Sequence, residues 1–439
     1  MRRLLYIFII GLLLCSYTWA DGSRYASKSL LSEGKWVKIR VDKTGIYKLS
    51  YADLKNMGFS DPSKVSVHGY GGWPLDEDFS KEYIDDVPST PVWRGSDYLL
   101  FYGKGPVKWE YDSSSQTFVH TNNPYSLYGY YFVTDATPTN DMTSVAQATG
   151  ATNRITTYDD YLVHEQELVS LAKSGRELYG EDFSGATPRT LSTFSSIPGI
   201  TNEDAKVTMS FVSKVTSGTG VASLSINQSN VLDVSIRSNR EEYVKALEGV
   251  SMAVWKGEKS EKNSVVVSYN SASHNNVRLN YVRLHFKRTL QPYGAYTFFR
   301  SIASIGNVSR FVVQGANANT LVFDVTDAQR VRLMETELNG SELTFSIPAG
   351  TLREFVLVRT DQSFISPEVV GEVENQNLHA LEQKDMIIIA AKAFQTQAER
   401  LAEEHRATDG LTVEVVDPQS IYNEFSSGAP DATAYRRFM

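Results

Sequence analysis

This sequence has a single cysteine, few long apolar runs and no excess of basic residues. The only cysteine among 439 residues is Cys15. Beyond residue 20 no apolar run reaches 18 residues, so we expect no later segment to cross a membrane as a helix. Lys and Arg number 43 against 51 Asp and Glu, a formal net charge of −8. Such a mildly acidic chain argues against a dedicated nucleic-acid binder, and we expect no nucleic-acid partner.

The first twenty residues have the layout of a secretory signal peptide. Two arginines precede an apolar run over residues 4–15, and small residues lead to an expected cleavage after Ala20. The run is shorter than the roughly 20 residues that span a bilayer, which disfavours an uncleaved anchor. Lipid attachment at Cys15 is the weaker alternative, because Leu14 stands where a small residue is expected. Cleavage would remove Cys15, leaving no disulfide, no cysteine-bound metal and no thiol nucleophile.

Aromatic residues are plentiful, with 24 Tyr and 20 Phe, and this favours β structure. Apolar and polar residues alternate at residues 35–41 and 46–49 around a glycine-containing loop, which predicts a β-hairpin. Ser50 and Asp53 have the spacing of a helix N-cap and its acidic N3 residue. Strands are also expected at residues 97–103 and 125–133. We expect the tyrosines of the latter to pack across strands, with sugar stacking as the alternative.

Three segments resemble ligand sites but lack a required feature. The glycines at residues 69–72 follow a predicted strand at 65–68, yet Pro74 and the lack of a helical run argue against a phosphate loop. The acidic stretch at residues 76–86 lacks the spacing of a calcium loop, so we expect a solvated loop. Residues 164–167, predicted on a short helix, hold one histidine where a zinc-binding His-Glu-x-x-His motif needs two.

The middle of the chain contains short apolar and β-branched segments separated by turn residues such as Asn339 and Gly340. This spacing predicts an antiparallel sandwich or jelly roll. The nine predicted strands are residues 207–212, 221–226, 231–236, 264–269, 277–286, 311–313, 320–325, 341–347 and 354–359.

A different pattern starts near residue 380. Residues 385–391 form a nearly continuous apolar run, which is typical of a strand buried on both faces in a parallel sheet. Residues 393–404 have helical spacing, and Gly410 ends the helix. The predicted apolar face of this helix consists of Phe394, Ala398, Leu401 and Ala402.

A second strand at residues 411–416 and a helix at 418–425 complete a β-α-β-α order, the opening of an α/β domain. Two parallel strands joined by one crossover cannot bury both faces of a sheet. We therefore expect a C-terminal domain that is cut short at Met439. The alternative is a complete chain whose last 60 or so residues dock on the β domains.

Several motifs resemble the gingipain family of cysteine peptidases. The N-terminal motifs resemble specifically the members of this family that are sortases of the type IX secretion system. The resemblance covers most of the chain after residue 20 and is weakest over residues 135–370. The motifs are residues 43–49, 68–72, 373–381, 385–389, 398–402, 415–416, 421–428 and 431–436.

The resemblance implies a caspase-like α/β peptidase domain with a His/Cys dyad, located at the outer membrane or cell surface. It implies partners among type IX secretion system outer-membrane proteins and removal of C-terminal signal domains from cargo. It further implies transfer of the cargo to an amine of anionic lipopolysaccharide, the acyl acceptor. This chemistry needs a thiolate and a neighbouring imidazole.

No position of this chain matches the dyad, which in the family lies on later strands. We expect His405 to be a solvated helix residue and His379 to be structural. We therefore assign no catalytic, cofactor-binding or metal-binding residue and no cofactor, and we expect the chain alone to be inactive.

The expected fold class is mainly β, with four parts along the chain. Two rival functions stay open: a noncatalytic surface protein that binds glycan or a partner, and a secreted gingipain-like protease with an N-terminal propeptide. The four parts are a signal peptide (1–20), an N-terminal β-rich domain (21–155), a β-sandwich or jelly-roll-like domain (156–372) and the truncated start of a gingipain-type α/β domain (373–439).

Overall fold

The computed structural model describes all residues except 1–24, 172, 174, 239–245, 272–273 and 275. The expected signal peptide, with Cys15, lies outside the described residues. In the described part of the chain the strands form seven sheets and the helices are short, so the predicted mainly β fold is confirmed. None of the helices in these residues is long and apolar enough to cross a membrane.

The N-terminal part contains two facing sheets around one core. In the first sheet, β1 (Trp36–Val41) lies between β27 (Glu368–Val373) and β9 (Gly129–Thr134). In the second, β2 (Gly45–Ser50) pairs with β6 (Tyr98–Gly103). Strand β27 comes from more than 300 residues further along the chain than β1. The first sheet is therefore complete only when these distant segments pair.

The predicted hairpin between residues 35–41 and 46–49 is wrong, because β1 and β2 belong to different sheets. Ile39 of β1 and Leu49 of β2 nevertheless point into the same core. The intervening loop therefore carries the chain from one sheet to the facing sheet. Alternation of apolar residues fixes which face of a strand is buried but does not identify its partner strand.

Two local predictions in this part are confirmed. Ser50 and Asp53 form a capping box at the start of α2 (Tyr51–Asn56), with Ser50 Oγ accepting the Asp53 N–H at 3.0 Å. The tyrosines in and just before β9 pack, since Tyr131 of β9 is buried in the core and the Arg40 guanidinium lies 4.1 Å from the ring centroid of Tyr128.

The middle of the chain is built on one nine-stranded sheet that serves two hydrophobic cores. At one end β14 (Ala205–Ser213) and β19 (Val277–Thr289) pack against the sheet that holds β15 (Thr219–Ile226). At the other end β26 (Glu354–Arg359) packs against the sheet that holds β21 (Ser309–Val313).

All nine predicted strands are present, and several other strands of the large sheet were not predicted. The strand β12 (Thr157–Glu165) joins the two halves of the large sheet, with β17 (Leu247–Trp255) at its edge and β20 (Tyr296–Arg300) next to β12. The predicted helix at residues 164–167 is wrong, because His164 lies in β12 opposite Val282 of β19. Ladder pairing with β19 overrides the local helical preference of these polar residues.

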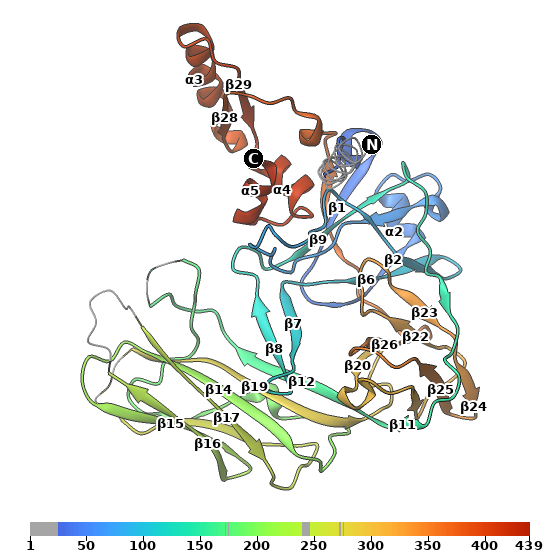
Figure 1. Cartoon of the computed structure of the whole chain (residues 1–439), viewed down its shortest axis with the longest axis vertical. Coiled ribbons are helices and arrows are strands. Elements are labelled where there is room, and N and C mark those ends of the chain that lie inside the picture. The colour runs from blue at the N-terminus through green and yellow to red at the C-terminus, as the bar shows by residue number, and fades with distance from the viewer. Residues whose placement is uncertain (1–24, 172, 174, 239–245, 272–273, 275) are drawn as a thin grey trace, which may run out of the picture.

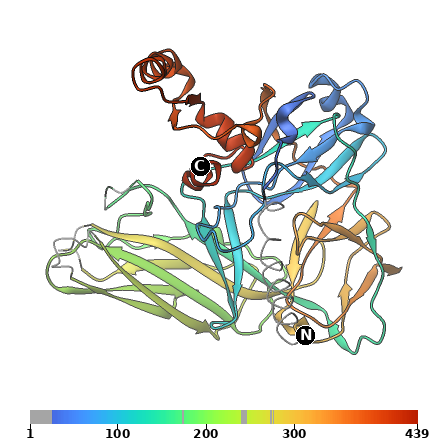
Figure 2. The ribbon, with the colours of Figure 1, turned by 45° about the horizontal axis from the view of Figure 1, so that its top comes forward.

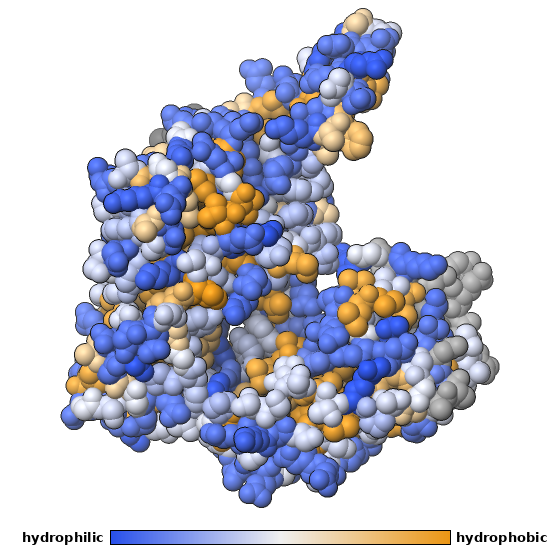
Figure 3. Space-filling view, turned by 180° about the vertical axis from the view of Figure 1, so that it is seen from behind, coloured by the Kyte–Doolittle hydropathy of each residue, from blue (hydrophilic) through white to orange (hydrophobic). Residues whose placement is uncertain are grey.

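A hairpin of β7 (Val107–Asp112) and β8 (Thr117–Asn122) connects the N-terminal part to the large sheet (Figure 1). Trp109 stacks on Tyr161 of β12 with ring centroids 4.0 Å apart. His120 pairs with Glu165 at the end of the same strand, at 2.7 Å. Seen from behind, the surface is hollowed between the upper and lower parts that this hairpin joins (Figure 3).

The predicted β-α-β-α order at the C-terminus is confirmed. Here β28 (Met386–Ile389) and β29 (Val413–Val416) pair in parallel and are joined by α3 (Gln395–Thr408). Then α4 (Pro418–Phe425) and α5 (Ala432–Phe438) pack on each other beside the N-terminal part, while β28, β29 and α3 project away from it (Figures 1 and 2).

The predicted apolar face of α3 is only half buried. Ala398 and Ala402 are covered, whereas Phe394 is 65% exposed and Leu401 is 49% exposed. The helix ends where expected, since Gly410 has a φ of +69° just beyond it.

Candidate functional site

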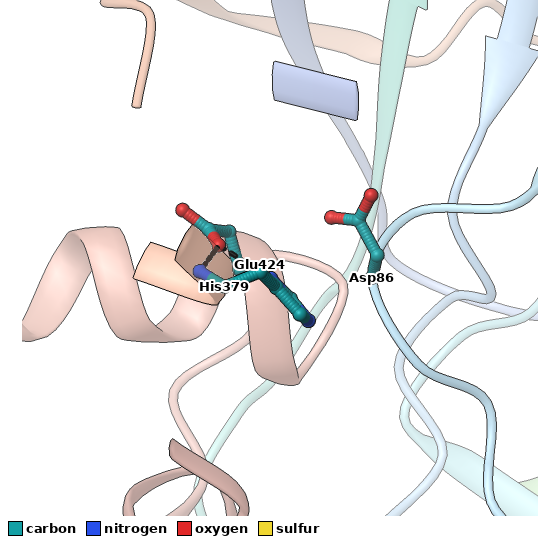
Figure 4. A group of neighbouring side chains, drawn as sticks. All are labelled: Asp86, His379 and Glu424. Carbon is teal, nitrogen blue, oxygen red and sulfur yellow. Dashed lines mark hydrogen bonds and ion pairs between the residues drawn. The ribbon is translucent and has the colours of Figure 1, made fainter. Parts of the chain in front are cut away.

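A buried cluster of charged side chains joins the C-terminal segment to the N-terminal part. His379 lies in a short turn before β28, Glu424 lies on α4, and Asp85 and Asp86 lie in the loop after β3 (Ser66–His68). His379 Nδ1 is 2.5 Å from Glu424 Oε2, and His379 Nε2 is 3.1 Å from Asp85 Oδ1. Figure 4 shows the His379 ring beside the Glu424 carboxylate, with Asp86 opposite them.

Glu424 is fully buried, and the turn before β28 surrounds its carboxylate. Its oxygens accept the backbone N–H groups of Leu378 at 2.8 Å and His379 at 3.0 Å, and the side-chain amide of Gln376 at 2.8 Å. The His379 ring also stacks on Phe425, with centroids 4.5 Å apart. A buried carboxylate needs such partners, and together they fix the turn against α4.

The cluster holds a positive imidazole. Burial by itself lowers the pKa of His379, but the hydrogen bonds and charges of Asp85 and Glu424 outweigh it and raise the pKa to about 10. His379 is therefore an imidazolium at neutral pH and donates through both ring nitrogens. Burial raises the pKa of Asp86. The hydrogen bonds that its carboxylate accepts from Leu30 N–H and Ser29 Oγ, each 2.7 Å long, lower this pKa but do not outweigh burial.

By distance alone, Asp86, His379 and Glu424 could hold a metal ion, since one ligand atom from each lies within 4.8 Å of the others. A histidine ligand must be neutral and offer a lone pair. His379 is protonated, and both of its nitrogens already donate to carboxylates. The arrangement is therefore better described as a buried ion-pair cluster than as a metal centre.

A buried lysine makes the second contact between the two parts. Lys38 of β1 is only 5% exposed, and its Nζ donates to Gly428 O at 2.7 Å and to Asn423 Oδ1 at 3.1 Å. The ammonium also lies 4.5 Å from the Tyr130 ring centroid. Burial lowers the pKa of Lys38 to about 7, so it loses its charge far more readily than an exposed lysine.

The third contact uses the glycines at residues 69–72, which form a turn and open no helix. Ser427 Oγ accepts the Tyr70 N–H at 2.9 Å and donates to Tyr130 O at 3.0 Å. Gly69 has a φ of +112°, and a Cβ added there would lie 2.6 Å from Ser427 Oγ. The glycine therefore permits a close approach of the two segments and is not part of a phosphate loop.

The acidic stretch at residues 76–86 is a loop, but the prediction that it is solvated throughout is wrong. Asp76 and Asp78 are exposed, whereas Asp85 and Asp86 are drawn into the cluster by His379 and by the residues before β1. The same loop borders α5, where the Arg437 guanidinium lies 4.2 Å from the Tyr83 ring centroid.

The two C-terminal histidines have different surroundings. His405 lies on α3, where its Nδ1 pairs with Asp409 one turn later at 2.6 Å, and its side chain is partly exposed. His379 is the centre of the buried cluster. The sequence holds no cysteine beyond Cys15, so neither imidazole has a thiol neighbour among the described residues.

Sequence reasoning missed Lys38, Asp85 and Ser427 as members of one junction. The residues that meet there are separated by 294 positions for Asp85 and His379 and by 385 for Lys38 and Asn423. No local pattern reports such contacts. The motif at residues 421–428, which resembles the gingipain family, supplies one side of the Lys38 and Tyr70 contacts, and its Glu424 holds His379.

The β sheets and the β-α-β-α segment define a mainly β protein that ends in a peptidase-family segment. Residues 379–439 match Peptidase family C25. The chain is also similar to the crystal structure of dimeric latent PorU from Porphyromonas gingivalis, with a TM-score of 0.87 and 33% identity over 94% of this chain. The chain is therefore a PorU-like protein that carries the start of a family C25 domain.

The match covers 40% of the PorU chain, so this chain spans less than half of that relative. An isomalto-dextranase from Arthrobacter globiformis T6, complexed with panose, aligns with 58% of this chain and 36% of its own at 9% identity. Its TM-score of 0.17 is too low to support any argument. No curated protein matches the sequence.

Proposed function

We propose that this chain is the N-terminal part of a PorU-type cysteine peptidase and that its β sheets hold and orient the peptidase domain. The observation that carries the proposal is the buried junction of His379, Lys38 and Ser427. Through it, the segment that matches family C25 is fixed to the N-terminal part by the His379–Asp85 ion pair and by hydrogen bonds of Lys38 and Ser427. Catalytic groups must be held in a fixed geometry, which such a rigid support provides.

The proposed activity is removal of C-terminal signal domains from cargo, followed by transfer to lipopolysaccharide. A cysteine thiolate attacks the scissile carbonyl, the C–N bond breaks, and the imidazolium gives its proton to the leaving amine. An amine of anionic lipopolysaccharide then attacks the thioester and gives a proton to the now neutral imidazole, so that the C–S bond breaks, the new amide forms and the thiolate is released. The proposed place of action is the outer membrane or cell surface, after export, with type IX secretion proteins as partners.

This chemistry needs a cysteine that the chain lacks after residue 20. The coding DNA should be read past Met439, and the whole gene product and residues 21–439 should be purified separately. We expect the whole product to remove the signal from a cargo protein and alkylation of thiols to abolish this. We expect residues 21–439 alone to be inactive.

Two outcomes would contradict the proposal. One is thiol-sensitive removal of the signal by residues 21–439 alone. The other is a stop codon directly after Met439 in several independent isolates, which would instead support a noncatalytic surface protein that binds glycan or a partner.

A further inference from the structure

A second feature of the molecule takes no part in the junction described above. A cavity of about 450 Å³ lies where the N-terminal part meets the large sheet. Eight of its lining residues are aromatic. Strands supply several of the rings, including Trp109 of β7, Tyr161 of β12 and both Tyr296 and Phe298 of β20. Because packed strands hold these rings, the aromatic surface is preformed.

Polar groups without partners lie among these rings. The buried indole nitrogen of Trp73 and the Nε of Arg300 have no hydrogen-bond partner among the described residues, and Tyr102 and Tyr161 bring their hydroxyls to the same cavity. Burial raises the pKa values of both tyrosines well above the ordinary range, so both hydroxyls keep their protons and can donate. Unpaired polar groups at a largely buried site cost free energy unless a ligand or water satisfies them.

The charged residues that line the cavity balance one another. Arg288 Nη1 donates to Asp160 Oδ2 at 2.8 Å, and Arg300 Nη2 donates to Glu354 Oε1 at 2.5 Å. Asp42 and Lys43 make up the remaining charge, giving three carboxylates and three cationic groups. An anion or a cation would therefore meet as much repulsion as attraction, and a neutral ligand fits the cavity better.

We propose that this cavity binds a neutral saccharide of one or two rings. Sugar rings present C–H faces that pack on aromatic rings and hydroxyls that both donate and accept hydrogen bonds. The hydroxyls of Tyr102 and Tyr161, the unpaired Trp73 indole nitrogen and the Arg288–Asp160 pair supply the matching polar groups. The site is separate from the peptidase junction, and its function does not depend on the peptidase activity.

The test uses residues 21–439 and an array of neutral mono-, di- and trisaccharides, followed by calorimetric titration with the saccharides that bind. Tyr102→Phe and Tyr161→Phe remove one hydroxyl each and keep the ring. We expect each to weaken binding by about fivefold to tenfold, the size of one hydrogen bond, without changing the unfolding temperature. Tyr128→Phe removes a hydroxyl from a ring outside the cavity and should leave the affinity unchanged.

Binding of no neutral saccharide on the array would overturn the proposal. Equal affinity of the wild type and the Tyr102→Phe/Tyr161→Phe double variant would also overturn it, because the sugar would then bind elsewhere. Titration with a proline-rich peptide, which also packs on aromatic rings, gives the third arm. Displacement of the saccharide by that peptide at lower concentration would assign the cavity to peptides and contradict the proposal.

Discussion

The carboxylate of Glu424 and the imidazole of His379 form the closest contact in the junction, with Oε2 and Nδ1 2.5 Å apart. The contact joins α4 to the turn before β28. His379 also pairs with Asp85, which joins both elements to the loop after β3. One histidine thus connects three segments that are distant in the sequence. Its positive charge accounts for its position between the two carboxylates.

Replacement of Glu424 should destabilise the chain. Glu424→Gln keeps the size of the side chain but leaves the His379 imidazolium with only the Asp85 carboxylate. Breaking a buried ion pair by removing one partner costs about 3–5 kcal/mol, so we expect a decrease in the free energy of unfolding of that order. Urea unfolding of both proteins measures it. Glu403→Gln, on the exposed surface of α3, is the control, and equal effects of the two changes would contradict the ion-pair assignment.

The pH dependence of stability should reveal His379. Its folded pKa of about 10 exceeds its ordinary value of 6.5, so its contribution is complete below pH 6.5 and is lost as the pH rises to 10. In Lys38→Met this loss should dominate, and the free energy of unfolding should fall between pH 7 and 10. A flat profile for Lys38→Met over this range would contradict the raised pKa.

Lys38 should change the pH dependence of the free energy of unfolding in the opposite direction to His379. Its folded pKa of about 7 lies below its ordinary value of 10.5, so burial of the charged form is costly at pH 7 and the cost disappears as the pH rises. In His379→Gln the free energy of unfolding should therefore rise between pH 7 and 10. In the wild type the two dependences should largely cancel. A His379→Gln profile that falls over this range would refute the assignment for Lys38.

Gly69 should be intolerant of any side chain. In Gly69→Ala the new Cβ meets Ser427 Oγ at 2.6 Å, and the backbone φ of +112° is unfavourable for alanine. Gly150→Ala is the matched control, because Gly150 also has a positive φ but a Cβ there meets nothing within 4 Å. We expect Gly69→Ala to lower the unfolding temperature clearly more than Gly150→Ala. Equal decreases would mean that only backbone strain matters and that Ser427 does not dock there.

The sequence predicted the elements that are governed by local patterns. The apolar run in β28, the spacing of α3 and the capping box at Ser50 each depend on neighbours within a few residues. The edge strand β17 was not predicted, and its apolar Val250 and Met252 lie on its exposed face, the reverse of the arrangement expected of a half-buried strand.

The contacts that make the junction were beyond local reasoning. Nothing near His379 in the sequence indicates Asp85 as a partner, and the same is true of Lys38 and Gly428. The alternation in β1 and β2 likewise fits both a hairpin and two facing sheets. Tertiary packing decides such cases, and its information is spread over the whole chain.

Hydrogen exchange in residues 421–437 of the 21–439 protein tests the central claim most directly. If the contacts of His379, Lys38 and Ser427 hold residues 421–437 against the N-terminal part, the helical amides of residues 421–437 should exchange nearly as slowly as those of β9 in the N-terminal core. In Glu424→Gln the protection should drop in residues 421–437 while β9 stays protected. Rapid exchange of residues 421–437 in the unaltered protein, with β9 protected, would show that the junction does not form and would contradict the account.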